Sequence, residues 1–118
     1  MKYMLLMYAN EADTPNTPEE QQAAAPAWDA SRTEVETAGV LLSSSGLAPI
    51  ADATTLRVRN EKRLIIDGPF VETHEQLGGY LLLDCKDLAE ALRWAEKIPT
   101  AKYGSIEIRP LNQWSQES

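Results

Sequence analysis

Short apolar runs bounded by polar residues, glycine or proline predict the strands of this chain. The expected strands cover residues 2–8, 40–42, 56–59, 63–67, 79–84 and 105–109. In residues 56–59, Leu56 and Val58 point one way and two arginines point the other. A turn at residues 60–62 leads into the next strand, which predicts a hairpin with one solvated face.

A first helix is expected from Pro18 to about Ala38. Thr17 stands at the N-cap position and Glu20 follows three residues later, an arrangement that satisfies free amide groups at a helix start. Pro26 lies inside this stretch and deletes one backbone hydrogen bond, so we expect a kink or break just before it. The apolar face of the helix is thin.

A second helix is expected after Asp87, whose carboxylate can accept hydrogen bonds from the first free amides. Pro99 ends it. Ala91, Leu92 and Ala95 are the residues expected near its core face.

Without the hairpin, the order is strand, helix, strand, strand, helix, strand. This order predicts an α+β fold of the ferredoxin-like type, in which an antiparallel sheet carries both helices on one face. The central strands should be residues 2–8 and 79–84, and in both of them the two alternating sets of side chains are apolar. The two sets in the first strand are Tyr3, Leu5 and Met7, and Met4, Leu6 and Tyr8. One set must face away from the helices, so we expect a homodimer in which two sheets pack into a barrel.

The length of 118 residues predicts one domain, residues 1–111, followed by a polar tail, residues 112–118. Eleven Lys and Arg against eighteen Asp and Glu give a formal charge of −7, which argues against nucleic acid and anionic membranes as partners. Cys85 is the only cysteine, so disulfides within the chain and multi-cysteine metal sites are excluded. We expect a cytoplasmic protein without a membrane span.

The connection from Asp67 to Gly79 is too long for a tight hairpin and holds His74, the only histidine. Pro69 disfavours a helical conformation for Gly68, so a strand should end at Asp67. An aspartate in such a turn commonly accepts amide hydrogen bonds from the turn itself, which predicts a structural role for its carboxylate.

Two function classes follow from this loop. In the first, slightly favoured, the protein binds a small molecule or a protein partner at the barrel and the loop, without breaking a bond. Its candidate ligand-binding residues are Phe70, Glu72, Glu75 and Trp28, although core packing is the commoner role for such a tryptophan.

In the second class, the protein is an enzyme acting on a small, mostly apolar substrate. Asp67 and His74 are then the candidate catalytic residues, because an imidazole titrates near neutrality and neighbouring carboxylates would orient it. Neither a nucleophile triad nor a Gly-rich phosphate loop is present, and no cofactor is expected. No metal is expected either. A divalent ion held by Asp67, Glu72, His74 and Glu75 is an alternative without a supporting ligand spacing.

Several motifs together resemble the DGPF branch of the YCII-related domains. They are Met1-Lys2-Tyr3-Met4-Leu5-Leu6, Asp67-Gly68-Pro69-Phe70, Glu72-Thr73, Glu75-Gln76-Leu77-Gly78-Gly79 and Glu107-Ile108-Arg109-Pro110. The resemblance spans nearly the whole chain and implies a dimeric α+β barrel. It also implies a link to extracytoplasmic-type sigma factors, beside which some branch members are encoded.

The wider family is thought to include enzymes with a His-Asp pair. Aligned by eye, that histidine falls at Trp28 and that aspartate at Ile98, and neither residue here can move a proton in the way the pair would. Enzymatic activity is therefore not implied by the resemblance. His74 stands where the branch usually has lysine.

Overall fold

The computed structural model describes residues 1–112 and 114, so most of the expected polar tail, residues 112–118, lies outside the described residues. The helices and strands are β1 (Lys2–Ala9), α1 (Pro18–Thr37), β2 (Leu41–Gly46), β3 (Thr54–Arg59), β4 (Lys62–Asp67), β5 (Gln76–Asp84), α2 (Leu88–Glu96) and β6 (Ser105–Pro110). The short 3-10 helices are η1 (Glu11–Asp13), η2 (Ile50–Asp52) and η3 (Pro99–Lys102).

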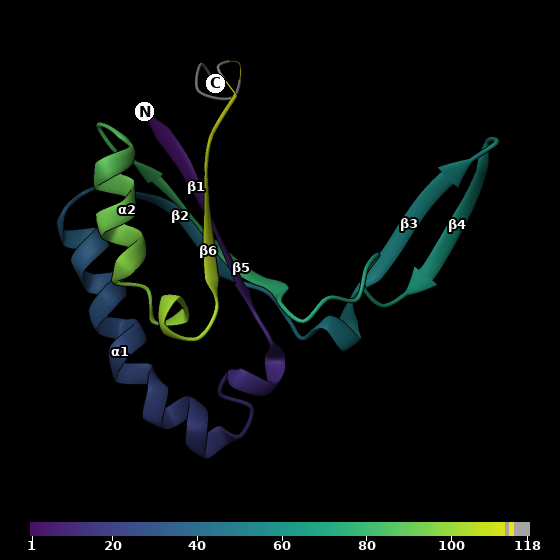
Figure 1. The fold of residues 1–118 in the computed structure, drawn as a ribbon, viewed down its shortest axis with the longest axis horizontal. Helices are drawn as coiled ribbons and strands as arrows, with labels where there is room; N and C mark the ends of the chain where they lie inside the picture. The colour runs from purple at the N-terminus through teal and green to yellow at the C-terminus, as the bar shows by residue number, and fades with distance from the viewer. Residues whose placement is uncertain (113, 115–118) are drawn as a thin grey trace.

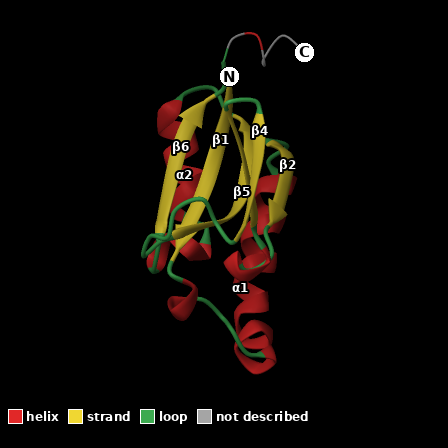
Figure 2. Ribbon diagram, turned by 90° about the vertical axis from the view of Figure 1, so that its right-hand side faces the viewer, coloured by secondary structure: helices red, strands yellow, loops and turns green. Residues whose placement is uncertain are grey.

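Within the described residues, four strands form one antiparallel sheet in the order β2-β5-β1-β6. Helices α1 and α2 lie together on one face of this sheet (Figures 1 and 2). With the hairpin set aside, this is the ferredoxin-like strand order, so the predicted α+β fold is confirmed. Strands β1 and β5 are central, as the sequence predicts.

The alternation of β1 decides which apolar set faces the helices. Tyr3, Leu5 and Met7 are buried beneath the helices, together with Ala9 at the strand end. These side chains form the core with residues of β5 and α2, the residue after β5 and the residue before η3: Leu83, Cys85, Ala91, Ala95 and Ile98.

The second apolar set lies on the opposite side of the sheet, which we call the bare face. It consists of Met4, Leu6 and Tyr8 from β1 with Tyr80 and Leu82 from β5, and all five are half-buried. Across the strands, Met4 pairs with Leu82 and Leu6 with Tyr80. The bare face is therefore a continuous apolar strip along the middle of the sheet.

Helix α1 begins as predicted, because the Thr17 hydroxyl oxygen accepts a hydrogen bond from the Glu20 amide at 3.1 Å. The hydroxyl in turn donates to the Glu20 carboxylate at 3.1 Å. Of the kink or break predicted just before Pro26, the break is wrong, since α1 continues through it. Pro26 and the residues on either side of it are exposed, so water can reach the carbonyl that has no helical partner.

Helix α2 is capped by Asp87, which accepts a hydrogen bond from the Glu90 amide at 2.9 Å, as expected. Ala91 and Ala95 are buried, but Leu92 is 48% exposed, so its predicted core position is wrong. One residue is a rotation of about 100° around a helix, which turns Leu92 away from the face that the two alanines present to the sheet.

Strands β3 and β4 form a separate hairpin, which we call the arm (Thr54–Asp67). Its turn residues Asn60 and Glu61 have φ angles of 52° and 65°, values typical of a two-residue hairpin turn that follows the strand twist. The arm projects from the sheet on the side of the bare face (Figures 1 and 2). The prediction of only one solvated face is wrong for the single chain, because Leu56, Val58, Leu64, Ile65 and Ile66 are all exposed.

No helix among the described residues combines the length and the hydropathy that crossing a bilayer requires.

Candidate functional site

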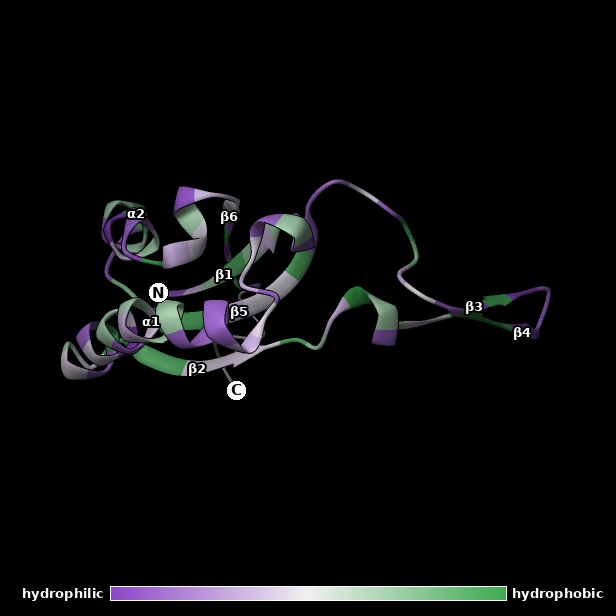
Figure 3. Cartoon of the chain, turned by 90° about the horizontal axis from the view of Figure 1, so that it is seen from below, coloured by the Kyte–Doolittle hydropathy of each residue, from purple (hydrophilic) through white to green (hydrophobic). Residues whose placement is uncertain are grey.

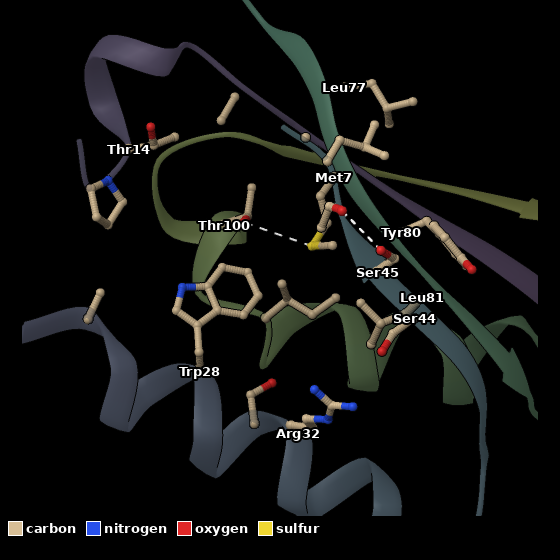
Figure 4. A pocket seen from close by; sticks show the side chains of 18 of the residues that line it. Met7, Thr14, Trp28, Arg32, Ser44, Ser45, Leu77, Tyr80, Leu81 and Thr100 are labelled. Atoms are coloured by element: carbon tan, nitrogen blue, oxygen red, sulfur yellow. Dashed lines mark hydrogen bonds between the residues drawn. The ribbon is translucent and has the colours of Figure 1, made fainter. Parts of the chain in front are cut away.

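The cavity that the fold forms beneath α1, which we call the α1 cavity, measures about 700 Å³. It lies between the side of α1 that carries Ala24, Trp28 and Val35 and the helix-covered face of β1, β2 and β5. Residues of the η1 region and of η3 also line it. Figure 4 shows many of the side chains that line it.

Trp28 is the largest side chain in the wall of the α1 cavity. Its indole rises from α1 toward Met7 and Thr100 (Figure 4), and it packs against the core while remaining half-buried. The indole N–H makes no hydrogen bond to any described residue, so it is available to a molecule in the cavity. Core packing and ligand contact, which the sequence treated as alternatives for Trp28, are therefore compatible.

Apolar side chains share this wall with polar and charged ones, among them Glu11, Gln21 and Asp29. The buried hydroxyl of Thr100 donates weakly to the sulfur of Met7 at 4.0 Å. Ser31 and Ser44 contribute hydroxyls from α1 and β2. Arg32 also lines the cavity, and its Nε donates to Glu36 at 2.8 Å. Apolar surface with polar groups beside it that can orient a ligand is typical of a binding site for a small molecule.

Ile98, the residue that takes the place of the family's aspartate in our alignment, also lines the α1 cavity and is buried. Trp28 and Ile98 thus border the same space. The wall contains an indole and a hydrocarbon side chain where the resemblance would put an acid and a base.

A second hollow, which we call the arm groove, measures about 990 Å³ and runs from the end of the bare face to the base of the arm. Phe70 lines it and is 71% exposed. Glu75 lines it as well, and its carboxylate accepts a hydrogen bond from the Ser105 hydroxyl at 2.8 Å. Two of the candidate ligand-binding residues of the loop therefore lie together, but on the side of the sheet opposite Trp28.

Asp67 is the last residue of β4, is exposed, and lines neither hollow. Its carboxylate makes no hydrogen bond to a described residue, so the predicted acceptance of amide hydrogen bonds from its own turn is wrong. The turn is held by other groups. The Gly68 amide donates to the Ala53 carbonyl at 2.7 Å, and the Thr55 hydroxyl donates to the Gly68 carbonyl at 2.8 Å.

Glu72 and His74 are also exposed and line neither the α1 cavity nor the arm groove. His74 makes no hydrogen bond or ion pair to the part of the chain that the structure describes. Among the described residues, no three His, Cys, Asp or Glu side chains gather closely enough to hold a metal ion. Asp67, Glu72, His74 and Glu75 therefore do not form a joint site in the single chain.

Cys85 is the one thiol in the sequence, and only 2% of the residue is exposed. Burial raises the pKa of the Cys85 thiol, and the carboxylates of Glu90 and Asp84 raise it further, against the opposite effect of the N-terminal ammonium. The thiol therefore stays protonated at neutral pH. This environment is the reverse of the one that activates a cysteine nucleophile.

The polar part of the cavity wall was not predicted from the sequence. Thr100 and Ser44 lie in unremarkable stretches, and only folding brings them beside Trp28. One feature of the sequence did indicate a cavity, namely the thin apolar face of α1. A helix with Ser31 between Trp28 and Val35 cannot fill the space above a sheet as completely as a continuous row of leucines would.

The fold and the cavity together define a small α+β protein with a ligand-sized space between helix and sheet. Comparison with known proteins gives the family. The family model of the YCII-related domain matches residues 1–115, and the chain belongs to this family. The predicted relationship is thereby confirmed.

An uncharacterized protein of Rhizobium meliloti (strain 1021) is 38% identical over 114 residues, which cover 94% of this chain and 92% of that protein. Among solved structures, 5-chloro-2-hydroxyhydroquinone dehydrochlorinase (TftG) from Burkholderia phenoliruptrix AC1100, in complex with 2,5-dihydroxybenzoquinone, is 12% identical. It superposes with a TM-score of 0.48, covering 95% of this chain and 94% of that one. Similarity at this level assigns no activity to this chain.

Proposed function

We propose that this protein is a homodimeric binding protein that holds one small, mostly apolar molecule per chain in the α1 cavity. The observation that carries the proposal is the cavity itself, about 700 Å³ in volume and bordered by Trp28. This volume falls in the range of known small-molecule sites, roughly 300–1,000 Å³.

The chemistry of the wall favours a flat, weakly polar ligand. A half-buried indole offers an apolar ring face for stacking and an N–H for one hydrogen bond. The hydroxyls of Thr100, Ser31 and Ser44 offer further hydrogen-bond positions. Leu81, Val35 and Ile98 supply the apolar remainder of the enclosure.

Binding is proposed in preference to acid–base catalysis. Asp67 and His74 are exposed and lie outside the cavity, and no contact among the described residues orients one toward the other. Trp28 and Ile98 occupy the places of a proton-transferring pair without being able to transfer a proton. The location also differs from the barrel interior that the sequence suggested, because the α1 cavity is on the helix side of the sheet.

The homodimer is proposed from the bare face. Five half-buried apolar or aromatic side chains lie together there without cover in the single chain. Completing the burial of each would contribute roughly 0.5–1 kcal/mol, about a third of the usual value for a fully exposed side chain, because most of each is already buried. A twofold axis lets one such surface cover another copy of itself.

The binding proposal is tested with the fluorescent probe 8-anilino-1-naphthalenesulfonate. Saturable binding of one probe per chain is expected, and Trp28→Ala should weaken it about tenfold or more, because the central wall of the site is removed. Trp114→Ala removes the same chemistry from an exposed position and is the matched control, with unchanged affinity expected.

A third variant, Leu82→Asp, separates the α1 cavity from the bare face as the site of the probe. Equal loss of affinity in Leu82→Asp and Trp28→Ala, or no loss in Trp28→Ala, would overturn the assignment of the site.

A further inference from the structure

We propose that the arm packs across a second copy of this chain and extends the interface that begins at the bare face. The inference rests on the proposed homodimer and goes beyond it, because it assigns a function to a segment that does not belong to the sheet.

The register of the arm sorts its side chains onto two sides. Leu56 lies opposite Ile65, and Val58 lies opposite Arg63, so Leu56, Val58 and Ile65 share one side. We call this the apolar side of the arm. Its three apolar residues are 55%, 56% and 58% exposed. The other side carries Leu64 and Ile66 among Arg57, Arg59 and Lys62.

Within one chain, the arm has little to pack against besides its own two strands. Its two strands pack on each other, and no other described element makes an extensive contact with either of them. An isolated two-stranded hairpin is marginally stable in water, and it gains stability when an apolar side is covered. The radius of gyration of the chain is 16.2 Å, whereas a compact domain of this length would have about 13.5 Å. A single chain therefore leaves the arm extended beside the body (Figure 3).

The position of the arm indicates that a molecule bound to the bare face would also contact the arm. Arm and bare face lie on the same side of the sheet (Figures 1 and 2), so a body seated on the bare face meets the arm. The arm groove joins the two regions, since Tyr8 and Glu107 line it from the sheet and Thr54 and Phe70 line it from the base of the arm. One partner can therefore contact both surfaces without a gap.

Charge favours a second copy of the chain as that partner. The arm has four basic and two acidic side chains and carries +2, while the rest of the sequence, with seven basic and sixteen acidic side chains, carries −9. An arm of one copy laid on the body of another brings opposite charges together. Nucleic acid or an anionic membrane would attract the arm but would be repelled by the body.

Sedimentation equilibrium of the full chain tests the contact. Ile65→Asp places a charge on the apolar side of the arm, and the dissociation constant of the dimer should rise about tenfold or more. Leu64→Asp, the neighbouring residue on the other side of the same strand, is the matched control and should change it by less than about threefold. Circular dichroism and urea unfolding of each variant establish that the body remains folded.

Hydrogen exchange gives an independent readout. In the wild-type dimer, the amides of β3 and β4 should exchange about ten times more slowly than in Leu82→Asp, a variant that opens the dimer without touching the arm. Equal exchange in both proteins, or an Ile65→Asp dimer as tight as wild type, overturns the arm contact and leaves the homodimer standing. A wild-type chain that remains monomeric overturns the homodimer itself.

Discussion

Trp28 combines two roles in the structure, because it packs against the core and lines the α1 cavity. The indole lines the same cavity as Ile98, a residue that supplies no carboxylate. These two positions therefore supply no group that could transfer a proton. The binding function proposed above rests on the geometry of this wall.

Cys85 leads to a prediction about pH. Because burial and nearby carboxylates raise its pKa in the folded state, the unfolded thiol ionises first as the pH rises. The unfolded state then binds fewer protons than the folded state, so the stabilising contribution is complete below the unfolded pKa, about 8.5, and is lost above it.

The measurement is urea unfolding at pH 7 and pH 9.5 for wild type and Cys85→Ala. The wild type should lose more stability between the two pH values than the variant, since other titrating groups affect both proteins alike. An equal loss in both would contradict the prediction.

At the scale of the element, the sequence correctly predicted the helix caps and the strand end that depend on neighbouring residues. The caps at Thr17 and Asp87 and the end of β4 at Asp67 follow from hydrogen bonds and backbone restrictions within a few residues, and all three were correct. The predicted core position of Leu92 was wrong because helical spacing alone does not fix which face of a short helix meets the sheet. Strand β2 runs on through three serines because hydrogen bonds to β5 override their low preference for strands.

Pro26 leads to a prediction about the stability that helix α1 contributes. Its ring removes one hydrogen bond from the interior of α1 although the helix continues, so Pro26→Ala should increase the free energy of unfolding by about 1–3 kcal/mol. Pro18→Ala is the matched control, because a proline at the first turn of a helix removes no helical hydrogen bond. Urea unfolding measures both changes. A stability gain in Pro18→Ala as large as in Pro26→Ala would contradict the explanation.

At the scale of the molecule, the topology was predictable and the site was not. The order of elements and the double apolarity of two strands determine which strands are central, and this reasoning needs only the pattern of side chains. The α1 cavity depends on how far α1 stands from the sheet, a distance set by packing among residues far apart in sequence. The composition of the loop from Asp67 to Gly79 suggested a site, yet Asp67, Glu72 and His74 are exposed and line neither hollow.

The last prediction concerns assembly. If the bare face is covered by a second copy, folding and association are linked, and the midpoint of thermal unfolding should rise with protein concentration. Leu82→Asp should abolish this rise, because a carboxylate in the apolar strip would be buried without a partner. Leu92→Asp, on the exposed side of α2, is the control and should retain it. Thermal unfolding between about 1 and 100 µM tests the three proteins side by side. A wild-type midpoint that is independent of concentration, with a monomer mass in the ultracentrifuge, would mean that this chain tolerates its apolar strip in water.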